Sequence, residues 1–186
     1  VLTALPLLYF LSKRMDKKQI FMLTTATMCV LISLPHILRM LGWFPGNESP
    51  FLLVGLFLPV LLGFMIFPVS TIIVDSQLVD IADEHEYNTG ARAEGIIFSV
   101  RSFSIKATSG FGGFIAGFGL EYIGFPENAE VGNLAPETIT GLLTMIGPLY
   151  LLVYAVAIGF MAFYRIDKKR HEEMLVELEA RRASSS

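Results

Sequence analysis

Two basic side chains, Arg101 and Lys106, lie inside the otherwise apolar stretch 95–120, where they could contact a solute or a coupling ion. If a helix over this stretch enters a bilayer at its first residue, Lys106 lies about 16 Å deep and Arg101 about 9 Å deep. Lipid does not solvate a charge at such depth, so each side chain must face protein, a partner or water. Mostly small and polar residues share the helical face of Lys106, and they are Ser99, Ser102, Phe103, Ser109, Gly110 and Gly113. This face is typical of the wall of an aqueous cavity.

Two interpretations of Lys106 therefore stay open. In the first, Lys106 belongs to a solute or coupling-ion site together with Ser102 and Ser109 on the same face. In the second, it forms a structural ion pair with a carboxylate on a helix outside this sequence. Arg101 lies nearer the membrane surface and could extend its head group to the interface.

A second cluster of charged residues lies in the polar segment 75–94, which contains five acids between Asp75 and Glu86. Asp80 and Asp83 are three residues apart and are therefore adjacent on a helix, and the pattern is interrupted at Gly90. The segment lacks the His and Cys spacing of a zinc site and the periodicity of a calcium loop. We expect salt bridges to basic residues of neighbouring loops rather than acid catalysis.

The elements that must position these clusters are helices that cross a membrane. Of all residues, 53% are hydrophobic and 17% are charged, against about 45–50% and about 25% in soluble domains. The apolar residues are concentrated in runs that are each long enough to cross a hydrocarbon core of about 30 Å. The predicted spans are residues 19–42, 51–74, 95–120 and 138–164, and residues 1–12 are expected to end a further span that starts upstream.

The charges of the loops orient these spans. Four basic residues lie in the loop 13–18 and six in the tail 165–186, whereas residues 43–50 and 121–137 contain no Lys or Arg. Basic residues favour the cytoplasmic side of a membrane. We therefore expect the basic loop, the segment 75–94 and the tail in the cytoplasm, with the tail forming an amphipathic helix.

Several classes of function are disfavoured. The sequence lacks Ser-His-Asp, nucleotide-loop and HExxH patterns, so we expect neither an enzyme nor a resident cofactor or metal in this part of the protein. The net charge of −3 does not predict a nucleic-acid partner. A single cysteine excludes a fold built on disulfides.

The stretch DIADEHEYNTGARAEGIIFSVRSFSIK resembles the glycoside–pentoside–hexuronide:cation symporter family, the sodium/melibiose symporter group of the major facilitator superfamily. The residues that match the family pattern are Asp80, Asp83, Glu86, Gly90, Arg92, Glu94 and Lys106. The basic loop LSKRMDKK is similar to the family's loop between helices 8 and 9. The resemblance covers essentially the whole chain and maps it onto the end of helix 8 and helices 9–12.

The resemblance implies an all-α membrane protein, the C-terminal half of a twelve-helix carrier that couples sugar uptake to Na⁺ or H⁺ entry by alternating access. It implies that Lys106 lies near the central cavity, with Thr71 contributed by the span before it. It also implies a cytoplasmic gate formed by charged residues: Asp80, Asp83, Glu86, Arg92 and Glu94. The family's cation carboxylates lie in the N-terminal half, so the coupling cation is expected to bind mainly outside this sequence.

The expected partners are a sugar or glycoside, the lipid bilayer and the N-terminal half of the same protein, in a bacterial inner (plasma) membrane. The melibiose symporter has a Trp late in helix 10, where this chain has the residues 68–71, PVST, so melibiose itself is not the expected substrate. Two alternatives stay open. One is a related carrier for a lysophospholipid or a drug, and the other is a non-transporting membrane scaffold, which has no need for a lysine at the midplane.

Overall fold

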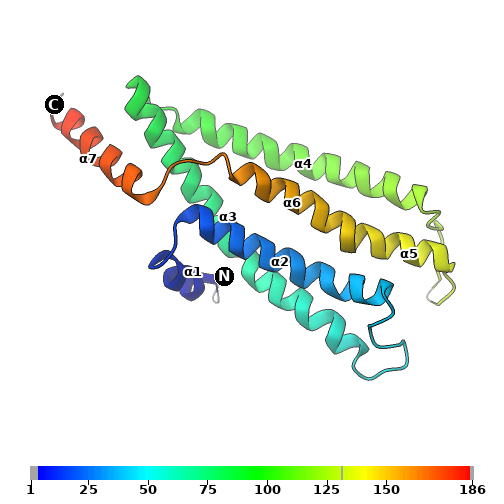
Figure 1. Cartoon of the computed structure of the whole chain (residues 1–186). Coiled ribbons are helices and arrows are strands. Elements are labelled where there is room, and N and C mark those ends of the chain that lie inside the picture. The colour runs from blue at the N-terminus through cyan, green and yellow to red at the C-terminus, as the bar shows by residue number, and fades with distance from the viewer. Residues whose placement is uncertain (1–3, 131, 185–186) are drawn as a thin grey trace.

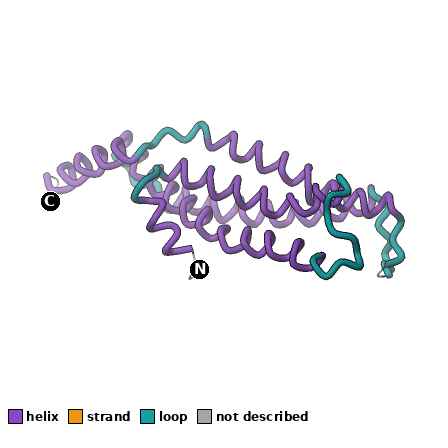
Figure 2. The backbone as a smooth tube through the Cα atoms, turned by 60° about the horizontal axis from the view of Figure 1, so that its bottom comes forward, coloured by secondary structure: helices purple, strands orange, loops and turns teal. Residues whose placement is uncertain are grey.

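The computed structural model describes residues 4–130 and 132–184, and within these ranges it consists of helices joined by loops (Figures 1 and 2). The helices are α1 (Ala4–Ser12), α2 (Lys17–Met40), α3 (Leu52–Thr89), α4 (Glu94–Tyr122), α5 (Pro136–Thr144), the π-helical turn η1 (Met145–Leu149), α6 (Tyr150–Met161) and α7 (Lys168–Ser184). Residues 1–3 of the predicted helix end at 1–12, and residues 185–186 of the tail, lie outside the described residues.

The helices α2 and α3 form the packed centre of the molecule. Their contact contains small polar side chains, because the hydroxyl of Ser70 lies 2.9 Å from that of Thr24 and accepts a hydrogen bond of 3.2 Å from Thr25. Gly63 allows a close approach as well, since a Cβ atom there would lie 3.1 Å from Cγ1 of Ile32. Small residues and interhelical hydrogen bonds are what hold helices together where lipid removes the hydrophobic driving force.

A single continuous helix, α3, carries both the second predicted span and the acidic segment that follows it. Its 38 residues extend over about 57 Å at 1.5 Å per residue, far beyond a hydrocarbon core of about 30 Å. The helix ends where the sequence predicts an interruption, because Gly90 adopts the left-handed conformation at φ +73° and its N–H donates to the carbonyl of Glu86. The acids of 75–86 therefore extend rigidly from the span.

The last apolar run forms α5, η1 and α6 in one stack against α2. The π-helical turn contains Pro148, whose missing N–H interrupts the regular helical hydrogen-bond ladder. Ser33 of α2 donates to the carbonyl of Ile146 inside this turn at 3.3 Å. Gly147 lies close to α2 too, since a Cβ atom there would lie 3.1 Å from Cγ1 of Ile37.

Three helical stretches are long and apolar enough to cross a membrane: Lys17–Met40, Leu52–Thr89 and Pro136–Met161. The helix α4, with 29 residues, carries Arg101 and Lys106 and is not among them; no residue of α4 is buried within the described chain. Membrane crossing by residues 95–120 therefore stays a prediction.

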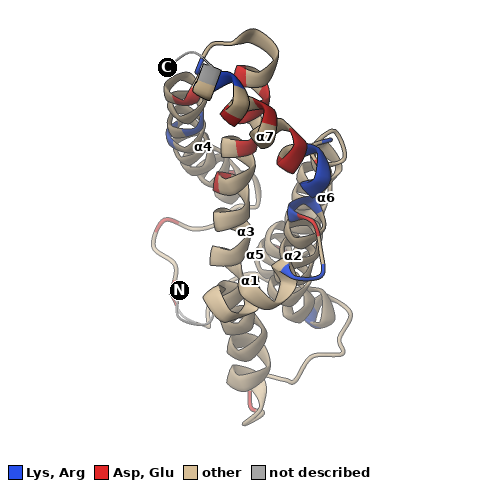
Figure 3. Ribbon diagram, turned by 90° about the vertical axis from the view of Figure 1, so that its left-hand side faces the viewer, with Lys and Arg blue, Asp and Glu red and all other residues tan. Residues whose placement is uncertain are grey.

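The two ends of the helix stack differ in character. The α2–α3 and α4–α5 loops lie together at one end, whereas the end of α3 and α7 lie at the other (Figure 1). Acidic and basic residues gather around the end of α3 and around α7 (Figure 3). We call this region, which the end of α3 and α7 form, the charged end. The side chains of Met174 and Leu178 of α7 are buried there.

Candidate functional site

Asp80 is the centre of the charged end. It is 2% exposed, and its carboxylate receives hydrogen bonds from Lys17 Nζ at 2.6 and 2.8 Å and from the hydroxyl of Tyr164 at 2.8 Å. The ring nitrogen Nε2 of His171 lies 3.4 Å away. One buried carboxylate thus joins α2, α3, the link after α6 and α7.

The position of Lys17 follows from the way α2 begins. Asp16 precedes the helix with extended backbone dihedrals, and its N–H donates to the side-chain oxygen of Gln19 at 3.2 Å. Lys17 is consequently the first helical residue, and Lys18 beside it donates to the carbonyls of Ala162 and Tyr164 at 2.8 and 3.1 Å. The two lysines tie the basic loop to α3 and to the end of α6.

The remaining acids of the α3 end pair with α7. The expected salt bridges to neighbouring basic segments are present, and a helix of the tail supplies most of them. The pairs are Asp83 with His171 at 3.0 Å, Glu84 with Arg170 at 2.6 Å and Glu86 with Arg182 at 2.8 Å.

A hydrogen-bonded triad extends this contact along α7. Tyr87 donates to Glu177 at 3.1 Å, and Arg181 donates both to Glu177 at 2.5 Å and to the carbonyl of Tyr87 at 2.9 Å. The hydrogen bond from Arg181, followed by that from Tyr87, lowers the pKa of Glu177 below its ordinary value.

Arg92 connects the end of α3 with the start of α4. Its Nη2 lies 2.7 Å from Glu94 and its Nε lies 3.7 Å from Glu86. The hydrogen bond to Glu94 is the main cause that raises the pKa of Arg92. The five residues predicted for the gate therefore fall into two sets: Glu86, Arg92 and Glu94 form one chain of ion pairs, whereas Asp80 and Asp83 pair with Lys17 and His171.

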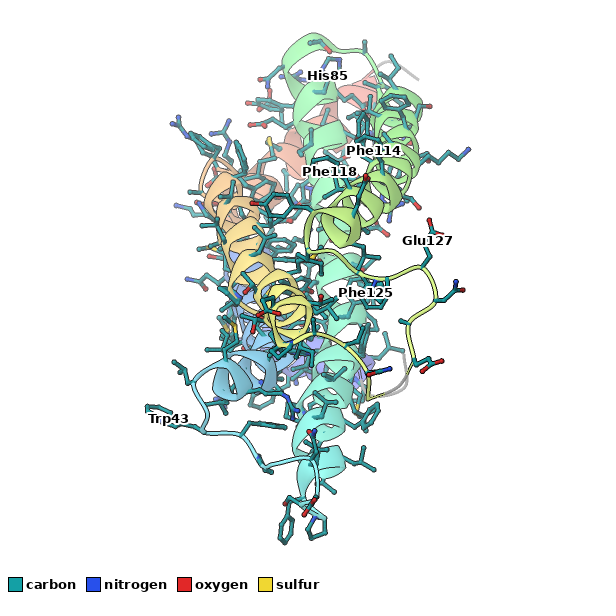
Figure 4. All side chains as sticks on the ribbon, turned by 90° about the vertical axis from the view of Figure 1, so that its right-hand side faces the viewer. Trp43, His85, Phe114, Phe118, Phe125 and Glu127 are labelled. Atoms are coloured by element: carbon teal, nitrogen blue, oxygen red, sulfur yellow. The ribbon has the colours of Figure 1, made fainter. Side chains whose placement is uncertain are left out.

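Lys106 lies elsewhere, on an exposed face of α4 that it shares with the exposed Ser102 and Ser109. A shallow hollow of about 470 Å³ lies beside it, bordered by Gly110 and Phe111 among others. Figure 4 shows α4 with all side chains drawn, and labels Phe114, which borders the same hollow, and Phe118.

Thr71 is not brought to Lys106. It lies in a cavity of about 630 Å³ that is lined mainly by apolar side chains from α2, α3, α4 and α6, and to which α4 contributes Arg101 and Ser104. On a helix with about 100° between residues, Ser104 and Lys106 point about 160° apart. Arg101 Nε lies 2.5 Å from Oδ1 of Asp75, without the alignment of a hydrogen bond.

Several side chains of the charged end are not singled out by the sequence as functional candidates, among them Lys17, Tyr164, Arg170, His171 and Arg182. The basic tail was a visible signal for the arginines, but nothing in the sequence pairs a particular tail residue with a particular acid. Among the described residues, no group of three or more His, Cys, Asp or Glu side chains is arranged to hold a metal ion.

The sequence model of the MFS/sugar transport protein family matches residues 1–168 of the chain. The chain belongs to this family. Within this family, the similarity is to the glycoside–pentoside–hexuronide:cation symporters. The chain is an all-α, membrane-embedded member of the major facilitator superfamily.

Three relatives illustrate the similarity. An isoprimeverose transporter of Lactiplantibacillus pentosus is 29% identical over 94% of this chain and 34% of its own length. An uncharacterized symporter of Bacillus subtilis (strain 168) is 35% identical over 52% of this chain and 20% of its own length. A glucuronide carrier protein homolog of Escherichia coli (strain K12) is 32% identical over 55% and 22%. The chain thus spans between a fifth and about a third of these major facilitator relatives, and no solved structure matches it.

Proposed function

We propose that the chain is part of a secondary active transporter that moves a sugar or glycoside together with Na⁺ or H⁺ by alternating access. The observation that carries the proposal is Lys106 on an exposed, polar face of α4, in a chain that belongs to the MFS/sugar transport protein family. The names of the isoprimeverose transporter and the glucuronide carrier homolog support a carbohydrate as the substrate class.

Lys106 can contact a solute because it lies on the side of α4 that is turned away from the other helices. The opposite side of α4 borders the cavity between α2, α3 and α6, so Lys106, Ser102 and Ser109 are turned away from these helices. In a two-half carrier this surface faces the central pathway, where an ammonium group and two hydroxyls can donate to sugar oxygens or a carboxylate. The coupling cation binds mainly through residues of the other half.

The charged end acts as the cytoplasmic gate in this proposal, with its acids alternately engaged and released as the carrier opens. Asp80, Asp83 and Glu86 lie within two helical turns at the end of α3, so a rigid tilt of this helix moves all three together. The excess of basic residues in the loop 13–18 and the tail supports a location of this end on the cytoplasmic side of a bacterial plasma membrane.

The test uses the full-length transporter in membrane vesicles with an imposed Na⁺ or H⁺ gradient. We expect Lys106→Ala to abolish accumulation of the transported sugar, and Lys106→Arg to retain part of it, because the second keeps the charge. Lys169→Ala is the matched control, since Lys169 is an exposed lysine whose ion pair, to Glu173, lies within α7. All variants are compared at equal amounts in the membrane.

Accumulation by Lys106→Ala at the level of the parent protein would exclude the proposed role of this lysine. A panel of glycosides, pentosides, hexuronides, lysophospholipids and drugs identifies the solute. Gradient-driven flux of a lysophospholipid or a drug alone would favour the related carrier, and absence of flux for the whole panel would favour a scaffold.

A further inference from the structure

The contact between α7 and the end of α3 combines a small apolar centre with ion pairs at both ends. Met174 and Leu178, which are 4% and 2% exposed, form the apolar part. In the sequence of α7 they lie between Arg170, which pairs with Glu84, and Arg182, which pairs with Glu86. The contact therefore rests on two apolar side chains and on charges that hold it at either side.

The flanking ion pairs are open to solvent on their arginine side. The side chains of Arg170 and Arg182 are 54% and 49% exposed, whereas those of Glu84 and Glu86 are 28% and 12% exposed. Salt screens the interaction of an ion pair to the extent that solvent reaches it. By contrast, the buried carboxylate of Asp80 is held from α2 by Lys17, and His171 of α7 lies 3.4 Å from it. The Lys17 contact at Asp80 involves no residue of α7, whereas the two arginine pairs hold α7.

One carboxylate oxygen is shared between α7 and the α3–α4 link. Oε2 of Glu86 lies 2.8 Å from Nη2 of Arg182 and 3.7 Å from Nε of Arg92. Both arginines are positioned to neutralise the same acid, and Arg182 holds it at the shorter distance. When α7 moves away, Arg92 is already placed to take over.

The segment that leads into α7 is fixed independently. Lys18 donates to the carbonyls of Ala162 and Tyr164, and Ile166 is 8% exposed. The two hydrogen bonds of Lys18 attach residues 162–164 to α2 rather than to α7.

We propose that α7 docks reversibly on the end of α3, and we call it the clasp. When α7 is docked, its basic residues pair with acids of the same chain that the gate of the transporter requires. Docking of α7 and engagement of Asp83, Glu84 and Glu86 by other basic residues of the transporter then exclude each other. The role of these acids in a gate rests on the proposed function, whereas the competition for Glu86 does not.

The experiment measures docking directly, in the full-length protein with all native cysteines replaced. Nitroxide labels at Asn88→Cys and Ala183→Cys report proximity through dipolar broadening of the electron paramagnetic resonance spectrum. Both positions are exposed and close in sequence to the pair of Glu86 with Arg182. We expect a broadened spectrum at low salt and loss of the broadened component at high salt.

Charge reversal tests the ion pairs. Arg170→Glu is expected to remove the broadened component at low salt, and the exchange Glu84→Arg with Arg170→Glu to restore it. Lys169→Glu makes the same change of charge one residue away and is expected to retain the broadening, since Lys169 pairs within α7. Equal loss in Lys169→Glu, or full broadening in Arg170→Glu, would overturn the clasp.

Substitution of Arg92 tests whether Arg92 and Arg182 compete for Glu86. Arg92→Gln is expected to raise the salt concentration at which half the broadening is lost at least twofold, whereas Arg165→Gln, an exposed arginine before α7, leaves it unchanged. An unchanged midpoint in Arg92→Gln would refute the competition. Because the spectra require no transport, they test the clasp whether or not the proposed function holds.

Discussion

The ion pair of Lys17 with Asp80 predicts that substitutions of its two residues lower the stability of the protein by unequal amounts. The side chain of Lys17 is 36% exposed and that of Asp80 is 3% exposed. If Asp80 is changed to Asn, the ammonium group of Lys17 can turn to water. If Lys17 is changed to Met, the carboxylate stays buried and keeps only the hydroxyl of Tyr164 at 2.8 Å and the ring of His171 at 3.4 Å. The lysine substitution is therefore the more damaging one.

The magnitudes follow from this asymmetry. Removing one partner of a buried pair costs about 3–5 kcal/mol, because the other charge is left uncompensated. We take about 3 kcal/mol for Lys17→Met, since Tyr164 still donates to the carboxylate. Asp80→Asn loses charge-assisted hydrogen bonds without leaving a buried charge, which costs about 1.5 kcal/mol. In the double variant no charge is buried, so we expect it to be more stable than Lys17→Met alone.

Thermal unfolding of the purified protein in detergent, followed by circular dichroism, measures these differences. With about 2–4 °C per kcal/mol for a chain of this size, Lys17→Met should lower the Tm by about 6–12 °C and Asp80→Asn by about 3–6 °C. Lys13→Met is the control, because Lys13 is an exposed lysine of the same basic loop, over the ring of Tyr9. The reasoning is refuted if Asp80→Asn is the more damaging single change, or if the losses of the two single variants add in the double variant.

Two further outcomes can be measured on the same protein. Gly141→Ala should destabilise it by about 1–3 kcal/mol in thermal unfolding, because the new Cβ atom would lie 2.7 and 2.8 Å from Cγ2 and Cβ of Ile123; Gly159→Ala, with nothing within 4 Å, should instead stabilise it by about 0.5–1 kcal/mol. Glu177 has a lowered pKa in the folded protein, so its contribution to docking of α7 is present above its unfolded pKa and is lost as the pH falls through the folded value. The difference in nitroxide broadening between the parent and Glu177→Gln should therefore disappear at a pH low enough to protonate Glu177, and a difference that persists there would contradict the role of the Arg181 contact.

Much of the helical framework can be predicted from the sequence, because length and absence of charge are properties of the chain itself. The uncharged runs of 19–38 and 138–164 correspond to α2 and to the stack of α5, η1 and α6. The change of polarity at residue 75, where the predicted span 51–74 ends, does not end the helix. Helical hydrogen bonds continue wherever no residue interrupts them. The interruption predicted at Gly90 is where α3 ends, with Gly90 in a left-handed conformation.

The partners of the acidic segment could not be predicted in the same way. Asp80 receives its hydrogen bonds from residues 63 and 84 positions away in the sequence. Periodicity describes one helix at a time and contains no information on which helices meet. The sequence analysis therefore predicts salt bridges to basic loops, yet it does not single out Lys17, Tyr164 or His171 as their donors.

The helix α4, which carries Lys106, is attached to α3 by the ion pair of Arg101 with Asp75 and also at the charged end. The helix α4 has no buried residue in the described chain, so packing contributes little to its position. The four-residue link 90–93 joins it to α3, and Arg92 pairs with Glu86 at the end of α3 and Glu94 at the start of α4. A change in the partner of Glu86 therefore alters the contact that orients α4, and with it the face that carries Lys106. Glu86, which pairs with both Arg92 and Arg182, is thus the residue through which α7 can influence the position of α4.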